Sequence, residues 1–197
     1  MTKIPASLSL TLPAWVQQHG STYSAQQDIT PRMDFVIKAA RENINQQTGG
    51  PFAAAIFEQD SGKLISVGVN IVTKEQLSIA HAEILAISLA QQHLQSFSLA
   101  RIPNSRFQLV SSSQPCAMCL GAISWSGISS LVCGALAEDA RAIGFDEGPI
   151  HPNWQQELEQ RGIATTTQVL RQQVIEVLRV YQQQGGDLYN ANKNTAD

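Results

Sequence analysis

HAE (residues 81–83) and PCAMC (residues 115–119) are two short motifs in this 197-residue sequence, and each stands at the head of a segment with helical apolar spacing. Cys116 and Cys119 are three residues apart, so on a first helical turn their sulfur atoms lie on one face. Pro115 suits that turn, because its missing N–H has no intrahelical acceptor to lose. The spacing therefore predicts a thiol pair at the start of one helix and a histidine at the start of another.

Two thiolates and one imidazole form a ligand set that suits Zn²⁺, and three protein ligands leave a fourth tetrahedral position for water. The partial positive charge at a helix N-terminus stabilises a thiolate and lowers the pKa of the cysteine. Glu83 follows His81 by two residues, which places a carboxylate beside the metal, where it can carry protons between water and a departing amine. A C-x-x-C pair alone is more typical of a structural zinc half-site or a redox pair. The combination with His-x-Glu favours a catalytic metal site.

The composition indicates one compact domain rather than a charged or membrane-bound chain. Apolar residues make up 43% and charged residues 15% of the sequence, and the formal net charge is −3. Without a run of Lys or Arg, the sequence offers no electrostatic footprint for nucleic acid or for a membrane surface. The apolar runs are too short to span a bilayer, and we expect no signal peptide. Because two of the three cysteines form the C-x-x-C pair, we expect metal or redox chemistry rather than a disulfide, and a cytoplasmic location.

Hydrophobic periodicity predicts alternating helices and strands. Residues 1–30 are expected to form an N-terminal arm, with Trp15 and Tyr23 as anchors, and residues 31–197 a single domain whose first helix is capped by Thr30. Strand 52–57 is expected to form a hairpin with a second strand, in which Ile65, Val67, Val69 and Ile71 share one face. Further helices are expected at 79–94, 115–125, 137–143, 154–161 and 170–181, and further strands at 107–110, 131–133 and 165–169. This order indicates an α/β domain with a mixed sheet.

From Pro31 to the C-terminus the sequence resembles the cytidine-deaminase-like superfamily, and most closely its bacterial guanine deaminase branch. Beyond the zinc motifs, the resemblance rests on GGPF (49–52), GVN (68–70), GAISW (121–125) and IGFDE (143–147), the last of which points to guanine deaminases. It implies a three-layer α/β/α sandwich with a central mixed five-stranded sheet, one zinc ion per chain, and hydrolytic deamination of guanine to xanthine and ammonia. A relative acts on both guanine and the triazine ammeline.

The resemblance also implies roles for individual residues. His81, Cys116 and Cys119 would bind zinc, and Glu83 would shuttle protons. The implied base contacts are Phe52 and Trp125 on the ring, Asn70 on a polar edge, the Ala82 backbone N–H near a ring carbonyl, and Tyr189 from a C-terminal segment that some relatives exchange within a homodimer. Glu147 would be a second catalytic residue beside the amidine, which it would orient or assist in the second proton transfer. Two positions depart from the family pattern: Gln114 stands where most relatives have Glu, and Glu147 where many have Asp.

Simpler interpretations stand beside these roles. Phe52 and Trp125 are also suited to core packing, Asn70 to a turn, and Glu147 to a solvated loop. We expect Cys133 to be an inert buried thiol, and His19, His93 and His151 to lie on the surface. The alternative functions are ammeline or cytosine deamination, tRNA adenosine deamination, and a non-catalytic zinc module. The acidic balance argues against tRNA as a partner, and the presence of Glu83 argues against a non-catalytic module.

Overall fold

A five-stranded mixed sheet forms the centre of the computed structural model, which describes residues 4–190. The strand order is β2-β1-β3-β4-β5. β1 pairs antiparallel with both β2 and β3, whereas β3–β4 and β4–β5 are parallel. The strands are β1 (Ala53–Glu58), β2 (Leu64–Val69), β3 (Phe107–Ser113), β4 (Ser130–Ala135) and β5 (Ala164–Thr166). The expected hairpin and mixed sheet are therefore confirmed.

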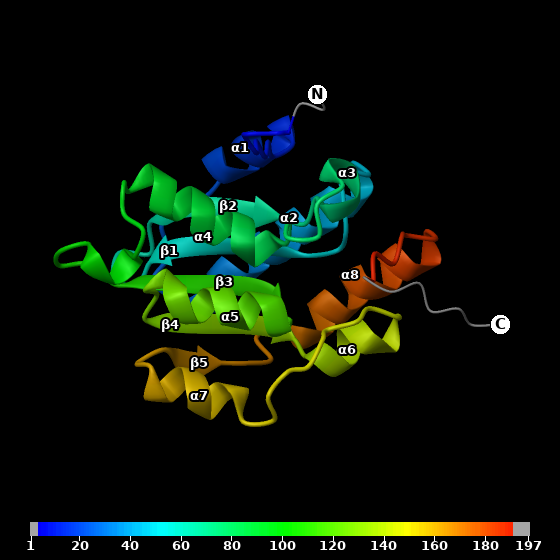
Figure 1. Ribbon diagram of the computed structural model, residues 1–197. Helices are drawn as coiled ribbons and strands as arrows, with labels where there is room; N and C mark the ends of the chain where they lie inside the picture. Colours follow the sequence, from blue (N-terminus) through cyan, green and yellow to red (C-terminus); the bar gives the residue numbers. More distant parts are fainter. Residues whose placement is uncertain (1–3, 191–197) are drawn as a thin grey trace.

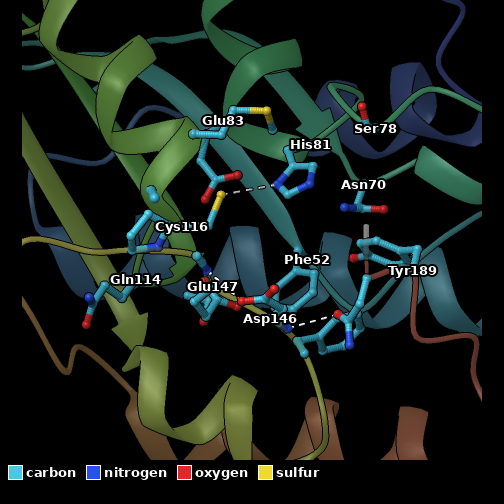
Figure 2. Close-up of a pocket in the computed structure, with 17 residues that line it drawn as sticks. Phe52, Asn70, Ser78, His81, Glu83, Gln114, Cys116, Asp146, Glu147 and Tyr189 are labelled. Atoms are coloured by element: carbon cyan, nitrogen blue, oxygen red, sulfur yellow. Dashed lines mark hydrogen bonds between the residues drawn. The ribbon is translucent and has the colours of Figure 1, made fainter. Parts of the chain in front are cut away.

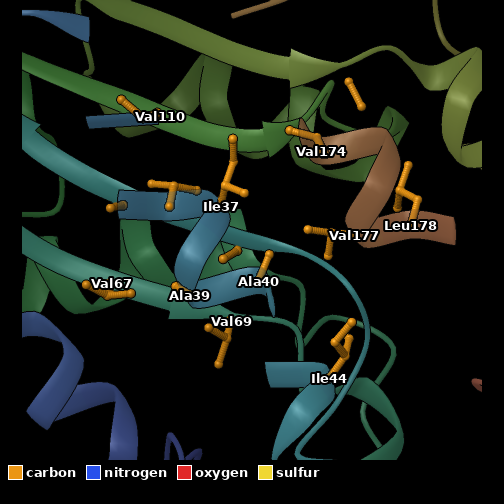
Figure 3. Packing of buried hydrophobic residues seen from close by; sticks show 14 of the residues in the cluster. Ile37, Ala39, Ala40, Ile44, Val67, Val69, Val110, Val174, Val177 and Leu178 are labelled. Atoms are coloured by element: carbon orange, nitrogen blue, oxygen red, sulfur yellow. The ribbon is translucent and has the colours of Figure 1, made fainter. Parts of the chain in front are cut away.

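Helices cover both faces of the sheet and complete the expected three layers (Figure 1). On one face α2 (Ile29–Asn45) and α8 (Arg171–Gln183) bury the larger hydrophobic cluster, in which side chains of both helices meet Val110 of β3 (Figure 3). On the other face α4 (Ala82–His93) and α5 (Ala117–Ser126) bury the second cluster. The remaining helices are α1 (Ala14–Ser21), α3 (Val72–Glu75), α6 (Ala137–Ala142), α7 (Trp154–Gln160) and a 3₁₀ turn at Leu99–Arg101.

A bulge in β2 overturns one expectation about the hairpin. Ile56 pairs with Ser66 and Phe57 with Leu64, so Ile65 is an extra residue without a partner on β1. The extra residue reverses the alternation of side chains. Ile65 therefore packs with the α4 and α5 cluster, while Val67 and its successors pack against α2 and α8. The expected common face of Ile65 with Val67, Val69 and Ile71 is wrong at its first residue.

The start of α4 lies unusually close to β2, and this contact places the HAE motif. A Cβ atom added to Gly68 would lie 2.1 Å from the carbonyl oxygen of Ala82. Ser66, two residues earlier on the same face, donates a hydrogen bond to the Ala86 carbonyl oxygen at 2.7 Å. Small side chains on this face of β2 therefore let the helix N-terminus dock directly on the sheet.

The N-terminal segment lies on the domain and contains a short helix, α1. Trp15 donates a hydrogen bond to Thr48 Oγ1 at 3.1 Å, and the Tyr23 ring packs 4.8 Å from Phe35. His19 does not lie freely on the surface as expected, because its ring stacks 4.3 Å from Phe35 and its burial lowers the pKa of His19.

The first long helix begins slightly earlier than expected. α2 begins at Ile29, two residues before Pro31, with Asp28 as its N-cap residue in place of Thr30. Pro31 still lies in the first turn, where its missing N–H costs no hydrogen bond.

Within residues 4–190, no helix has both the length and the apolar character that crossing a membrane requires.

Candidate functional site

Three metal-ligating side chains converge at the N-termini of α4 and α5. His81 and Cys116 are the N-cap residues of the two helices, and Cys119 lies in the first turn of α5. His81 Nδ1 is 3.6 Å from each of the two Sγ atoms, and all three ligand atoms lie within 4.8 Å of one another. Figure 2 shows the contact between Cys116 and His81. Tetrahedral Zn²⁺, with bonds of about 2.3 Å to sulfur and 2.05 Å to nitrogen, sets S···N edges of about 3.6 Å. The donor set fits zinc in both chemistry and spacing.

The same side chains concentrate negative charge in a buried place. A hydrogen bond with Cys119 lowers the pKa of Cys116 to about 4, against the effect of burial. The same contact, together with burial, raises the pKa of Cys119. Burial opposes protonation of His81, but the neighbouring Cys116 and Glu83 raise its pKa on balance. A divalent cation would offset this accumulation of negative charge, which is a second reason that the site suits zinc.

Glu83 lies beside the three ligand atoms on the first turn of α4, with only 6% of its surface exposed. Ser111 of β3 donates a hydrogen bond to Glu83 Oε1 at 3.1 Å, and Cys119 Sγ donates to Oε2 at 3.5 Å. Burial and the nearby Cys116 thiolate raise the pKa of Glu83. A carboxyl group that holds a proton more readily than usual is suited to proton transfer.

A cavity of about 320 Å³ opens next to these residues, a volume that suits a small flat molecule. Its lining comes from several segments far apart in the sequence: Phe52 and Asn70 beside the β1–β2 hairpin, His81 and Glu83 on the α4 side, and the segments 113–118, 145–149 and 189–190. Figure 2 shows the ring of Phe52 and the carboxamide of Asn70 on the side opposite Gln114. Two of the metal ligands, His81 and Cys116, therefore share one cavity with the expected base-binding residues Phe52, Asn70, Glu147 and Tyr189.

Asn70 forms the turn that its sequence position suggested, and it also lines the cavity. Its backbone N–H donates to the Phe52 carbonyl oxygen at 3.0 Å, and its Oδ1 accepts from the Val72 N–H at 3.3 Å. Asn43 of α2 donates to the Asn70 carbonyl oxygen at 2.8 Å. The Nδ2 group of Asn70 itself makes no hydrogen bond with residues 4–190, and the Asn70 side chain lines the cavity. The turn thus holds Asn70 in place and leaves an amide donor available. The Phe52 ring is fixed edge-on to Phe145, 5.0 Å between centroids.

Glu147 enters the cavity from the loop after α6. Its backbone oxygen accepts a hydrogen bond from the Ala117 N–H at 3.0 Å, which docks the loop on the start of α5. The side chain is buried rather than solvated, and burial together with the charges of Cys116 and Glu83 raises the pKa of Glu147 to about 8.

The C-terminal segment closes one side of the cavity of its own chain. Tyr189 packs 5.0 Å from Phe145, and its hydroxyl oxygen would lie 2.5 Å from a Cβ added to Gly50. Burial raises the pKa of Tyr189. Asn190 holds the segment in place: its Oδ1 accepts from the Asp146 N–H and its Nδ2 donates to the Gly144 carbonyl oxygen, both at 2.9 Å.

Two expected base contacts do not line the cavity. Trp125 is 82% exposed on the outer face of α5, beside Ile84 and Phe97, because that helix turns its other side to the sheet. The expectation that Trp125 contacts a base is therefore wrong within a single chain. Ala82 is the first residue of α4, where N–H groups lack an intrahelical acceptor, and its side chain is buried in the core.

The remaining sequence expectations have plain structural outcomes. Gln114 lines the cavity and accepts a hydrogen bond from the Ala137 N–H at 3.2 Å, so it ties the end of β3 to α6. Cys133 is buried in β4, and burial raises the pKa of its thiol to about 12. His93 and His151 are exposed, as expected.

Ser111 and Asn190 contact residues of the site, although no motif in the sequence pointed to them. The signal for Ser111 is the row of alternate β3 residues, which changes from Phe107 and Leu109 in the core to serine near the motif. For Asn190 no local signal exists, because its partners lie 44 and 46 positions earlier in the sequence.

Comparison with known proteins agrees with this geometry. Residues 27–135 match the family model described as the cytidine and deoxycytidylate deaminase zinc-binding region. The chain is 35% identical over 127 residues to a guanine deaminase of Bacillus subtilis, which covers 64% of this chain and 77% of that protein.

Solved structures extend the likeness over nearly the whole chain. A guanine deaminase from Nitrosomonas europaea is 44% identical, with a TM-score of 0.87, over 92% of this chain and 100% of that one. A chain solved in complex with 2,6-diaminopurine is 46% identical, with a TM-score of 0.88, over 94% of this chain and 97% of that one. With the His81, Cys116 and Cys119 cluster in place, the chain belongs to the family of zinc-binding cytidine and deoxycytidylate deaminase domains.

Proposed function

We propose that this chain is a zinc-dependent hydrolytic deaminase of a free amino-substituted heterocyclic base, and that it converts guanine to xanthine and ammonia. The observation that carries the proposal is the convergence of His81, Cys116 and Cys119, with Glu83 beside them, on a cavity of nucleobase size. The choice of guanine is supported by the likeness to guanine deaminases from two bacteria and to a chain solved with 2,6-diaminopurine.

The residues account for each proton that the reaction moves. Zinc, when bound, would supply a Lewis acid that lowers the pKa of water from about 15.7 to roughly 7. Glu83 accepts a proton from the attacking water and passes it to the ring nitrogen beside C2, while a C–O bond forms at C2. Glu83 then takes the remaining proton of the hydroxyl group on C2 and delivers it to the exocyclic amine, so that ammonia leaves as the C2–N bond breaks and a C2 carbonyl forms. One water is consumed and one ammonia is released.

The cavity residues supply the contacts that orient a base. Phe52 and Tyr189 provide aromatic surface, and the free Nδ2 of Asn70 offers a donor to a ring acceptor. Glu147 is assigned to the amidine portion, because a carboxyl group can accept from its N–H groups.

A homodimer is part of the proposal, and the exposed face of α5 supports it. The helix carries no charged residue, and its outer surface exposes Met118 and Trp125, next to the exposed Phe97. A contiguous apolar surface of this kind is typical of subunit contacts. Exchange of the C-terminal segment is not needed, since Tyr189 lines the cavity of its own chain. Trp125→Glu should shift the sedimentation coefficient from dimer to monomer, and a wild-type monomer at micromolar concentration would contradict the assignment.

The cellular setting follows from the same chemistry. A free base rather than nucleic acid is the expected partner, because the formal net charge is −3. The two thiol ligands must stay reduced to bind zinc, which favours the cytoplasm, and conversion of guanine to xanthine is a step of purine breakdown.

The test is a screen of ammonia release with guanine, ammeline, cytosine, adenosine and tRNA, run beside metal analysis of the purified protein. The proposal expects one zinc per chain and the highest kcat/KM with guanine. Faster turnover of ammeline or cytosine would reassign the substrate, and salt-sensitive turnover of tRNA would revive the editing alternative. Bound zinc without ammonia from any substrate would support a non-catalytic zinc module.

A further inference from the structure

Three consecutive serines end β3, and their side chains have different partners. Ser111, Ser112 and Ser113 are all buried. Ser112 Oγ accepts a hydrogen bond from the Ala53 N–H at 3.1 Å and so serves the pairing of β1 with β3. Ser111 Oγ instead donates to Glu83 Oε1 at 3.1 Å. Adjacent serines on opposite faces of one strand thus separate a structural contact from a contact with the proposed proton carrier.

The position of Ser111 follows from the alternation of β3. Gln108 and Val110 face α2, where Gln108 accepts a hydrogen bond from Arg32 at 2.9 Å. Phe107 and Leu109 face α4 and α5, and Ser111 continues their row at the level of the HAE motif. A polar group at this depth in an apolar row is costly unless it is hydrogen-bonded. Glu83 is the only hydrogen-bond partner of the Ser111 hydroxyl among the residues that the structure describes.

The two oxygens of Glu83 therefore have different surroundings. Oε1 accepts a hydrogen bond from the Ser111 hydroxyl group, whereas Oε2 lies 3.5 Å from Cys119 Sγ, on the side of the metal ligands. Figure 2 shows Glu83 beside His81. A carboxylate that receives a hydrogen bond on one oxygen is fixed in its torsion angle, and the other oxygen is left to take up a proton. Hydrogen bonds to a charged group are also among the stronger ones in proteins.

We propose that Ser111 is a positioning residue for proton transfer: its hydroxyl holds Glu83 Oε1 as an acceptor and so makes Oε2 the oxygen that carries the proton. Ser111 acts through Glu83 and does not line the cavity. The inference rests on the proposed deaminase function and adds to it the identity of the oxygen and of the group that orients it.

The experiment is a double-mutant cycle of Ser111→Ala and Glu83→Gln, with kcat, KM and zinc content measured for each enzyme. Loss of one hydrogen bond to a charged group should lower kcat by about 10- to 100-fold. KM and zinc content should stay near the wild-type values, since Ser111 touches neither the cavity nor the ligands. In the Glu83→Gln background the same substitution should change kcat less than twofold, because the group it orients no longer transfers protons.

Two comparisons separate positioning from a general effect on the strand. Ser112→Ala, the matched control on the opposite face, should lower the melting temperature and leave kcat within about twofold. Threonine and valine have nearly equal volumes, but only threonine keeps a hydroxyl group that can donate to Glu83. Ser111→Thr should therefore retain kcat, and Ser111→Val should not. Equal activity of these two variants, a kcat loss in Ser112→Ala as large as in Ser111→Ala, or additive effects in the cycle would overturn the role of Ser111. An inactive wild-type enzyme would instead refute the proposed function, and with it this inference.

Discussion

Glu83→Gln is the substitution that separates catalysis from folding and metal binding at this site. Glutamine has nearly the same shape, and its carbonyl oxygen can still accept the hydrogen bond that Ser111 donates at 3.1 Å. A buried amide is also less costly than a buried carboxylate, so the free energy of unfolding should not fall. The amide has no oxygen that takes up a proton near neutral pH. The substitution therefore removes the proposed chemistry and keeps the architecture.

The expected loss follows from the number of proton transfers assigned to one group. A positioned acid or base contributes about 10²- to 10⁴-fold to a single transfer. Because Glu83 serves two transfers in the proposed reaction, kcat with guanine should fall by at least about 10³-fold, a rise of roughly 4 kcal/mol in the barrier. Zinc should remain at one ion per chain, since the three ligand atoms do not include Glu83.

The assay is steady-state ammonia release, with zinc measured by atomic emission and stability by thermal unfolding. Glu157→Gln, an exposed change of the same kind on α7, is the control and should match the wild type in all three. A Glu83→Gln enzyme that binds zinc and keeps kcat within about tenfold of the wild type would refute proton transfer by Glu83. An enzyme that folds but loses its zinc would show that Glu83 supports the metal instead.

Three further substitutions test the surrounding structure. Asn190→Ala removes both hydrogen bonds that hold the C-terminal segment, so KM should rise about fivefold and hydrogen exchange of residues 187–190 should quicken. Asp139→Asn should flatten the acid side of the melting-temperature profile: the hydrogen bond from Arg171 lowers the pKa of Asp139, so its stabilising effect is complete above the ordinary value of about 3.9 and is lost as pH falls through the lower folded value. A profile of unchanged slope would contradict that reasoning. Leu178→Ala empties a core position that is 1% exposed and should cost about 2–5 kcal/mol in urea unfolding, whereas a loss below 1 kcal/mol would place that side chain outside the core.

The metal half of the site was predictable because its information is local. His81 and Cys116 are helix N-cap residues, and Cys119 follows Cys116 by three positions, so the motifs themselves determine which side chains lie on one face. The buried strand at 52–57 and the apolar face of α8 were predictable for a similar reason, since burial repeats with the period of the element.

The errors share a different cause, which is dependence on contacts that no short window contains. At Ile65 a bulge reverses which face of the sheet the β2 side chains meet, while the apolar and polar residues keep alternating in the sequence. His19 is half-buried because α1 rests above Phe35, and the sequence of α1 does not say where the helix packs. Trp125 lies on a helix that is apolar on all sides, so its pattern does not show which side meets the sheet.

The base-binding half of the cavity is assembled by long-range contacts, and this division predicts where substrate choice resides. Asn70 is held by Asn43, which is 27 positions away, and the loop before Glu147 is held by Asn190, 44 positions from Asp146. The zinc ligands and Glu83 depend instead on two helix starts docked on the sheet. A change in these loops can reshape the cavity without moving the metal site. Substitutions that alter which base is accepted should therefore fall in the turn at Asn70, the loop 144–149 or the segment 187–190, whereas changes near β3 and α4 should lower turnover of every substrate alike.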